Sequence, residues 1–520
     1  MADQNTIVHL LNVSLDQDYK HTLYFADAAA QTLYMSGRVR HSFSEFSYQR
    51  KDGVMRLPIA FDDAIKCNYV MYQNKNKWYY CFITKHEYKN EDQTDITIET
   101  DVLQTYMFDY SVLPSFVERE HVSDDTVGLH TIPENLEVGE YICQYKDQVT
   151  ELQDCSYIFG VTESIVSYTD VDKPVFGVME GARYDGIYSG VRYQAFPPDQ
   201  ISWLNGKIKD HAEGGKNDGI KCLFLYPTAL IDRPEGTFNI LASEKPKEIN
   251  KIIYHGAYDG YQPKNNKLYV FPYRYLLVSN NNGGSALYQY ELFDSEELLF
   301  TIKGCITPGG SIRMIPKGYK GQAVNNEEGL NLGKYPICNW ASDEYTNWLT
   351  QNSVNIGLSV AAGVGQIVGG VATAVATGGA GIAVGGGMAV GGVSTIANQL
   401  AQIHQMSFTS PQSRGNTNCG DVVAADKTNT FYFQQMRIRD ENMRVIDDYF
   451  TMFGYKCNRV KIPNKNHRSR WWFTKTIDVN ISCTNPIPQT DVEKIKNCYN
   501  NGVTFWKNNI KNYALDNPII

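Results

Sequence analysis

The feature that most constrains this 520-residue chain is a long stretch without charge. From Tyr345 to Ser413 there is no Asp, Glu, Lys or Arg, although these residues make up 20% of the chain. The centre of the stretch, Asn352 to Ile403, consists mainly of glycine, alanine and valine. Such a segment is compatible with a helical hairpin buried in a large core, a flexible glycine-rich loop or a segment that meets a membrane.

Two parts of the stretch have about the length needed to cross a membrane. Val360 to Ala376 and Gly381 to Ile396 are each near the lower limit of roughly 17 residues for a transmembrane helix. Thr377 to Ala380 forms a natural break between them, so a helical hairpin is the simplest geometry. Small residues recur four positions apart, a spacing that lets helices approach closely in lipid. These pairs are Gly365/Gly369, Gly381/Gly385 and Gly387/Gly391.

The composition indicates a segment that inserts under certain conditions and is not a permanent anchor. Between Asn352 and Ile403 there are only seven leucines and isoleucines and no phenylalanine, so insertion gains less than it would for a leucine-rich span. Its flanks also lack the Lys and Arg of a constitutive anchor. The residues that we predict to act on the membrane are Ile356, Leu358, Val360, Val364, Gly365, Ile367, Val368, Gly369, Val371, Val375, Gly381, Ile382, Val384, Gly385, Gly387, Met388, Val390, Gly391, Val393 and Ile396.

The remainder of the chain predicts a mainly β protein with some α (α+β). The aromatic run from Trp78 to Thr84 and the alternating run from Ile96 to Thr100 predict a hairpin with one buried face. Asp52-Gly53 predicts a turn between two further strands. Short apolar runs at Tyr157–Phe159 and Cys222–Leu225 predict strands separated by long loops.

The last hundred residues mix helix and strand signals. We expect a helix from Asp440 to Met452 and a second from Gln489 to Asn500, with a strand from Trp471 to Ile481 between them. In the first helix, we expect the apolar face to comprise Val445, Ile446, Tyr449 and Phe450. We expect four regions: 1–122 as an N-terminal β block, 123–344 as β-rich middle domains, 345–426 as the hydrophobic loop and 427–520 as a C-terminal α+β block.

Charge and motif content restrict the function. The net charge of −9 does not indicate a general nucleic-acid binder. Lys456 to Lys475 contains seven Lys and Arg and no acid, which indicates a solvated face or a patch that pairs with an acidic neighbouring subunit, or else contact with phosphate. We find no catalytic constellation and no His/Cys cluster with metal spacing, so we predict no enzyme, no cofactor and no metal. Eleven scattered cysteines and the absence of a signal sequence at Met1–Leu11 predict free thiols and synthesis in the cytoplasm.

An ordered set of short stretches resembles one protein family. In the N-terminal block they are Asp18-Tyr19-Lys20, Asn68 to Asn74, Lys77-Trp78-Tyr79, Glu87 to Asn90, Asp101 to Asp109 and Arg119 to Val122. In the C-terminal block they are Tyr455-Lys456, Asn458 to Lys461, Pro463-Asn464, Asn501 to Thr504 and Trp506. The set resembles the tail knob, or distal tail tube, proteins of small short-tailed phages of the Picovirus type. The middle, from about 123 to 340, resembles that family only loosely.

The resemblance implies a hexameric tube of β-barrel-forming domains at the distal end of the tail. It also implies that hydrophobic loops plug the tube, enter the host cell membrane on infection and form a channel. The partners implied are five further copies of the chain, an upstream tail tube or lower collar protein, the host membrane, and genomic double-stranded DNA that slides through without sequence-specific binding. Two alternatives remain open, a stand-alone pore-forming toxin and a tail-associated protein that binds a receptor or degrades cell wall.

Overall fold

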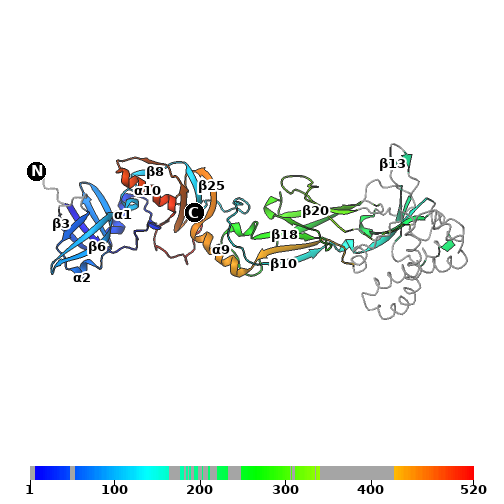
Figure 1. Cartoon of the computed structure of the whole chain (residues 1–520), viewed down its shortest axis with the longest axis horizontal. Coiled ribbons are helices and arrows are strands. Elements are labelled where there is room, and N and C mark those ends of the chain that lie inside the picture. The colour runs from blue at the N-terminus through cyan, green and yellow to red at the C-terminus, as the bar shows by residue number, and fades with distance from the viewer. Residues whose placement is uncertain are drawn as a thin grey trace, which may run out of the picture. The chain divides into compact units, whose positions relative to one another are not determined.

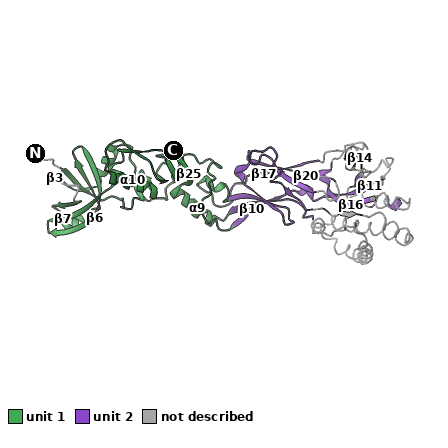
Figure 2. Cartoon of the chain, turned by 45° about the horizontal axis from the view of Figure 1, so that its top comes forward, with its two compact units in different colours: residues 1–140, 260–273, 438–520 green, residues 141–259, 274–437 purple. Residues whose placement is uncertain are grey.

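The chain is mainly β with few helices, and it divides into two compact units. The computed structural model describes residues 6–46, 53–162, 176–180, 183–184, 187–188, 192–196, 202, 206, 209–210, 220–231, 247–304, 306, 311–333, 335, 337–339 and 427–520. Unit 1 comprises Met1–Glu140, Gly260–Tyr273 and Ile438–Ile520, and unit 2 comprises Tyr141–Asp259 and Arg274–Arg437 (Figure 2). The chain therefore passes from one unit to the other four times.

The N-terminal part of unit 1 is a six-stranded antiparallel sheet with the order β3-β1-β5-β6-β7-β4 (Figure 1). Its strands are β1 (Thr6–Leu11), β3 (Val39–Phe46), β4 (Val54–Leu57), β5 (Tyr69–Asn74), β6 (Lys77–Asn90) and β7 (Gln93–Thr100). The pairing of β6 with β7 confirms the hairpin that the sequence predicts. At the expected turn, Gly53 has a φ of +60°, which favours glycine, whereas Asp52 lies outside the described residues.

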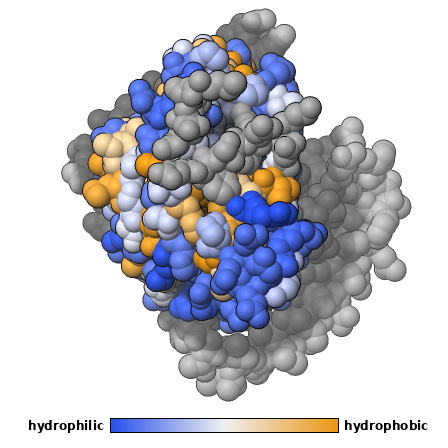
Figure 3. Space-filling view, turned by 90° about the vertical axis from the view of Figure 1, so that its left-hand side faces the viewer, coloured by the Kyte–Doolittle hydropathy of each residue, from blue (hydrophilic) through white to orange (hydrophobic). Residues whose placement is uncertain are grey.

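The surface of unit 1 at the end that carries β3, β6 and α2 (Phe61–Ala64) is largely hydrophilic, with separate hydrophobic areas (Figure 3). The other short helices of this part are α1 (Ala28–Ser36) and α3 (Val102–Thr105). Each begins at an aspartate, Asp27 or Asp101, whose side chain accepts a hydrogen bond from a backbone N–H of the first turn. These caps satisfy donors that have no partner inside the helix.

A second sheet of unit 1 has the order β2-β28-β26-β9-β25 and contains strands from both ends of the chain. They are β2 (His21–Leu23), β9 (Ser115–Glu120), β25 (Tyr455–Lys461), β26 (Trp471–Ile477) and β28 (Val503–Trp506). A separate pair, β8 (Tyr110–Val112) with β27 (Ile481–Cys483), also joins the two ends of the chain. The expected strand from Trp471 to Ile481 is thus two strands, because Asp478 has a φ of +51° and ends the first.

The two long helices of unit 1 occur where the sequence predicts them, as α9 (Asp440–Phe453) and α10 (Gln489–Asn501). The predicted apolar face of α9 is wrong in part. Ile446 and Phe450 are buried, but Val445 is 70% exposed, whereas Asp447 is fully buried. The buried stripe therefore includes a carboxylate, which a search for apolar residues cannot identify.

The described residues of unit 2 form antiparallel sheets around one apolar core. Its sheets have the orders β10-β24-β18-β19, β12-β15-β11-β16-β23 and β17-β20-β21-β22, with β13 paired to β14. The strands are β10 (Tyr141–Gln148), β11 (Cys155–Val161), β12 (Phe176–Glu180), β13 (Arg183–Tyr184), β14 (Ile187–Tyr188), β15 (Arg192–Phe196), β16 (Ile220–Pro227), β17 (Ile249–Tyr254), β18 (Arg274–Ser279), β19 (Ser285–Tyr288), β20 (Glu297–Gly304), β21 (Ile312–Pro316), β22 (Leu330–Asn331), β23 (Ile337–Asn339) and β24 (Tyr432–Ile438).

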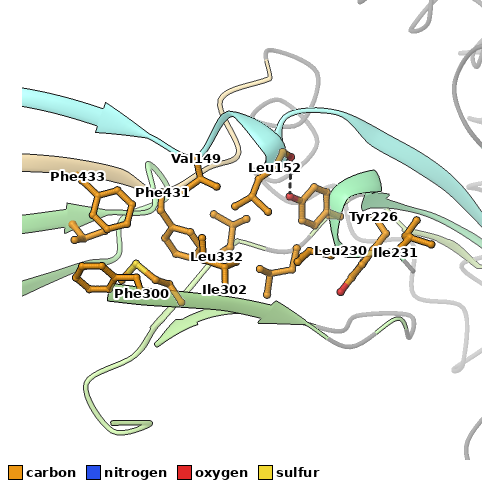
Figure 4. Close-up of a cluster of buried hydrophobic side chains, with 14 of the residues drawn as sticks. Val149, Leu152, Tyr226, Leu230, Ile231, Phe300, Ile302, Leu332, Phe431 and Phe433 are labelled. Carbon is orange, nitrogen blue, oxygen red and sulfur yellow. Dashed lines mark hydrogen bonds between the residues drawn. The ribbon is translucent and has the colours of Figure 1, made fainter. Parts of the chain in front are cut away.

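The core of unit 2 is formed by side chains from distant parts of the sequence (Figure 4). Phe300, Ile302, Phe431 and Phe433 are buried in it, and the rings of Phe300 and Phe433 lie 5.1 Å apart. The strand predicted around Tyr157 and the strand predicted around Cys222 pair with each other as β11 and β16. The expected four-region division stays a prediction. The compact units assign residues 123–140 to unit 1 and residues 427–437 to unit 2.

Candidate functional site: a sheet built from both ends of the chain

All the residues that we predict to act on the membrane, Ile356 to Ile396, lie outside the described residues, as does the whole region 345–426. In the part of the chain that the structure describes, no helix is long and apolar enough to cross a membrane. The site that the structure does describe is the second sheet of unit 1, which joins the N-terminal and C-terminal blocks.

The joining sheet interleaves the two blocks strand by strand. β9, from the N-terminal block, lies between β25 and β26, both from the C-terminal block, and Val117 is the partner of Arg459 on one side and of Thr476 on the other. At the opposite edge, β2 pairs in parallel with β28, with Thr22 opposite Phe505. Neither block can complete this sheet alone, so the two blocks form one folded unit.

Two tryptophans form the apolar centre beside this sheet. Trp471 and Trp506 are 0% and 1% exposed, and their ring centroids lie 5.0 Å apart. The indole N–H of Trp471 donates to the carbonyl of Thr451 at 3.1 Å, and that of Trp506 donates to Nδ1 of His21 at 3.2 Å. Both rings therefore bury large apolar surfaces while each polar atom keeps a partner.

A buried ionic cluster fixes the C-terminal end of β9. The carboxylate of Glu134 accepts hydrogen bonds from Arg119 and Lys267 and from the backbone N–H of Lys456 at 2.9 Å. The guanidinium of Arg119 also donates to the carbonyl of Gly454 at 2.7 Å. Burial lowers the pKa of Lys267, an effect that the charge of Glu134 opposes. The cluster links three segments that are distant in the sequence. A buried charge that loses its partner is strongly destabilising, so the cluster is stable only when all three segments are in place.

Gly454, at the end of α9, is required by the close approach of this helix to β9. Its φ is +64°, and a Cβ there would lie 2.1 Å from the carbonyl oxygen of Glu120. Any larger residue would force the chains apart. The glycine therefore permits the direct passage from α9 into β25.

Part of the basic stretch Lys456 to Lys475 pairs with acids of the N-terminal block. Glu120 is fully buried and accepts from Lys461 and from the backbone N–H of Asn464 at 2.7 Å. Lys475 contacts Glu118 at 2.9 Å. These lysines hold β9 between its neighbours, which favours an internal structural role for them over contact with phosphate.

His121, which has no apparent partner in the sequence, is fixed between two elements of the C-terminal block. Its Nδ1 accepts from the backbone N–H of Phe473 at 2.7 Å, and its Nε2 lies 3.1 Å from the carbonyl of Thr451, to which it donates. Burial lowers its pKa to about 3. The imidazole is therefore neutral with its lone pair occupied, and it cannot act as a general base in this arrangement.

A third buried carboxylate attaches the return segment Gly260–Tyr273 to α9. Asp447 accepts hydrogen bonds from Tyr261 Oη at 2.7 Å, from the backbone N–H groups of Lys264 and Asn265 at 2.8 and 3.1 Å, and from Asn265 Nδ2 at 2.8 Å. The return segment thereby becomes part of unit 1, although the sequence on either side of it belongs to unit 2.

A polar cavity of about 250 Å³ lies beside these groups in unit 1. Its lining includes His121, Lys264, Thr451 and Arg468, together with the C-terminal residues 515–518. The side chain of Asn517 accepts from the backbone N–H groups of Arg470 and Trp471 and closes one side. Because both ring nitrogens of His121 already have hydrogen-bond partners, its imidazole is not available to a molecule in this cavity.

Comparison with known proteins assigns the class from the N-terminal sheet. The family model for the N-terminus of caudoviral major tail proteins matches residues 4–111, which cover the six-stranded sheet of unit 1. The chain is therefore similar over this part to the tail proteins of tailed phages.

The rest of the chain identifies the family. The model for the C-terminal domain of the tail knob protein gp9 of Bacillus phage phi29 matches residues 241–518, more than half of the chain, so the chain belongs to the tail knob protein family. It is 25% identical to the phi29 tail knob protein gp9, with 98% of each chain covered, and 24% identical to that of Bacillus phage B103, with 98% and 97% covered. A structure of the bacteriophage C1 tail knob protein gp12 shares the fold, with a TM-score of 0.62 at 15% identity over 99% of this chain and 100% of that one.

Membership of this family confirms the resemblance found in the sequence and the position of the protein in the virion, at the tail tip. The family is structural and not enzymatic, as we predict from the motifs. Sequence reasoning missed the buried charges Arg119, Glu134, Lys267 and Asp447. A signal was available only for Asp447, which lies four positions after Met443 and three before Phe450 on the buried stripe of α9.

Proposed function

We propose that six copies of this chain form the distal tube of the phage tail, and that their hydrophobic loops plug the tube and then enter the host membrane to form a channel for the genome. One observation carries the proposal. The charge-free segment from Asn352 to Ile403 lies in the sequence between two blocks that complete the same sheet. A segment inserted in this way can change its surroundings while the sheet that holds the protein together stays intact.

The composition of the segment supports a change of surroundings. It has few leucines and isoleucines and many glycines, so it gains little from lipid as a single copy and inserts best as part of an assembly. Two short helices from each of six copies would be enough to surround a pore. A sheltered position inside the tube would keep this segment from water until it is released.

The charge of the chain supports a conduit through which DNA slides. The net charge is −9, and ion pairs with Glu118 and Glu120 neutralise part of the local excess of positive charge in the C-terminal block. A surface that does not attract phosphate lets duplex DNA pass without binding. In the virion, the partners of the tube would be an upstream tail tube or lower collar protein and the host cell membrane.

Deletion of Val354–Ile403, with a short glycine–serine linker in its place, tests the proposal. We expect the deleted protein to assemble into rings with a lumen wide enough for duplex DNA in electron micrographs. We also expect it not to release dye from liposomes, and phage that carry it not to eject their DNA. In a matched control, a scrambled sequence of the same length and composition replaces the segment. This control distinguishes the loss of the two proposed helices from the loss of chain length.

The outcomes separate the candidate functions. Rings without membrane leakage support the plug and channel. Collapse of the deleted protein would instead make the segment part of the core and end the proposal. A wild-type protein that permeabilises liposomes as single copies without forming rings would favour the pore-forming toxin alternative.

A further inference from the structure

An exposed apolar row crosses three strands of the joining sheet. Phe116 of β9 is the register partner of both Val460 of β25 and Ile477 of β26. Residues directly opposite each other in antiparallel strands lie on the same face, so the three side chains form one row. Val460 is 69% and Ile477 is 54% exposed, and Phe116 is half-buried.

The row lies on the face of the sheet that faces away from the core. Val117 and Thr476, which are the next residue of β9 and the preceding residue of β26, are 0% and 1% exposed. Because side chains alternate between the two faces of a strand, the buried neighbours show that the row belongs to the other face. Ile462, two residues after Val460, is also 54% exposed and extends the apolar surface beyond β25.

Two further features make this face suited to contact with a protein. β25 is the outermost strand of its sheet and, in the described part of the chain, it pairs only with β9, so its other edge can accept a neighbour. The row is bordered by charge, because the Lys475–Glu118 ion pair, in which the two side chains are about one-third exposed, lies on the two strands that carry Phe116 and Ile477. An apolar centre within a charged rim is the usual composition of a protein–protein interface.

We propose that this face, formed by Phe116, Val460 and Ile477 and continued by Ile462, binds a second copy of this chain. The inference rests on the hexameric assembly proposed above and names the surface that builds it. In a closed ring each copy uses two different surfaces, so the row contacts another part of its neighbour.

Charge complementarity identifies a second copy as the occupant. Residues 427–475, which provide β25 and most of β26, contain eleven Lys and Arg and four Asp and Glu, an excess of seven positive charges, so the remainder of the chain carries −16. The segment that carries the row is therefore basic as a whole, and every copy of the chain offers an acidic remainder that can pair with it. Exposed apolar residues that occur singly need no such explanation, but Phe116, Val460 and Ile477 are adjacent in register.

A matched pair of valines provides the test. Val460 on the row and Val445 on α9 are 69% and 70% exposed, and both lie in the C-terminal block. In the full-length protein, we expect Val460→Glu to raise the concentration at which half of the chains assemble by about tenfold or more, because a carboxylate enters an apolar contact. Val445→Glu should leave this concentration unchanged. Analytical ultracentrifugation measures assembly, and thermal unfolding measures whether each variant is folded.

The result decides between this surface and the proposed assembly itself. A folded Val460→Glu protein that assembles like the wild type would overturn the interface while leaving the hexamer standing, and so would equal losses in the two valine variants. If the wild type itself remains a single copy at all concentrations, the proposed assembly fails. Should Val460→Glu not fold, Ile477→Gln on β26 replaces it, with the same expected loss of assembly and the same opposing outcome.

Discussion

Unit 1 and unit 2 both have apolar cores, but unit 1 adds clusters of buried, paired charges to its own. Unit 1 buries ionised and polar groups, with Glu134 and Asp447 each surrounded by several donors. Unit 2 has an apolar core in which aromatic rings such as those of Phe300 and Phe433 meet at short distances. Buried polar groups are costly unless every donor and acceptor is matched, so they favour one arrangement over all others. The difference indicates that unit 1 uses buried charge, in addition to apolar burial, to select the correct pairing of distant segments.

The largest effect is expected in the apolar core of unit 2. Phe300→Ala removes a fully buried ring and leaves a cavity, so the free energy of unfolding of unit 2 should fall by about 4 kcal/mol. Calorimetry of the wild type and the variant measures this change, and the transition of unit 1 should not move. Equal shifts of both transitions would show that the two cores do not unfold separately.

A slightly smaller effect is expected when the ionic cluster of unit 1 is broken. Glu134→Gln leaves Arg119 and Lys267 buried without a counter-charge, and the unfolding free energy of unit 1 should fall by about 3 kcal/mol. Glu140→Gln is the control, because the Glu140–Arg439 pair is mostly exposed and surface pairs contribute little. Chemical denaturation compares the two.

Replacing the whole cluster sharpens the comparison. If charge serves pairing and not stability, the triple variant Arg119→Met, Glu134→Leu, Lys267→Met should recover most of the stability lost in Glu134→Gln. Its hydrogen exchange should be faster in β9 and β25, because the register is less well defined. If the triple variant recovers its stability and its hydrogen exchange equals that of the wild type, the cluster does not select the strand register.

An intermediate effect is expected at the return segment. Asp447→Asn retains the shape of the side chain but places an NH₂ group against the donors of Tyr261 and Lys264, so unit 1 should lose about 2 kcal/mol. Limited proteolysis should then cut within Gly260–Tyr273, which is protected in the wild type. Unchanged protection would mean that backbone packing alone holds this segment.

The smallest effect is a pH dependence confined to unit 1. Burial raises the pKa of Asp101 to about 6 against an ordinary value of 3.8, so the folded state holds this proton more tightly than the unfolded chain. Stability should therefore decrease as pH rises through this window, by about 1 kcal/mol between roughly pH 5 and pH 6.5. Asp101→Asn, which can still cap α3, should remove that part of the slope in thermal unfolding.

The sequence predicts local structure well where one residue pattern decides it. The β6–β7 hairpin, α9 and α10 follow from alternation or helical spacing and are found within a few residues of the expected positions. The interleaving of β9 between β25 and β26 could not be derived, because the paired residues are 335 to 361 positions apart and no local pattern encodes such a pairing. The burial of Asp447 and Glu134 was missed for a related reason, since a charged residue is assigned to the surface unless its partners are known.

The predicted functional site is a compositional inference, and the joining sheet is a geometric one. The absence of charge between Tyr345 and Ser413 can be read directly from the residues, whereas the neutral state of His121 depends on Phe473 and Thr451, which are brought to it only by folding. The family resemblance connected the residue composition with the folded geometry. It rested on short stretches, such as Arg119 to Val122, that lie in or next to the joining sheet.

The interleaved sheet also has a consequence for the order in which the protein can be made. β2 and β9 are synthesised within the first 120 residues, but their partners β25, β26 and β28 leave the ribosome only with the last 70 residues or so. A nascent chain therefore exposes an unfinished sheet throughout most of its synthesis and cannot close unit 1 before Trp506 is added. Chains that terminate before β25 would lack the surface proposed for ring formation, so they would not join a ring.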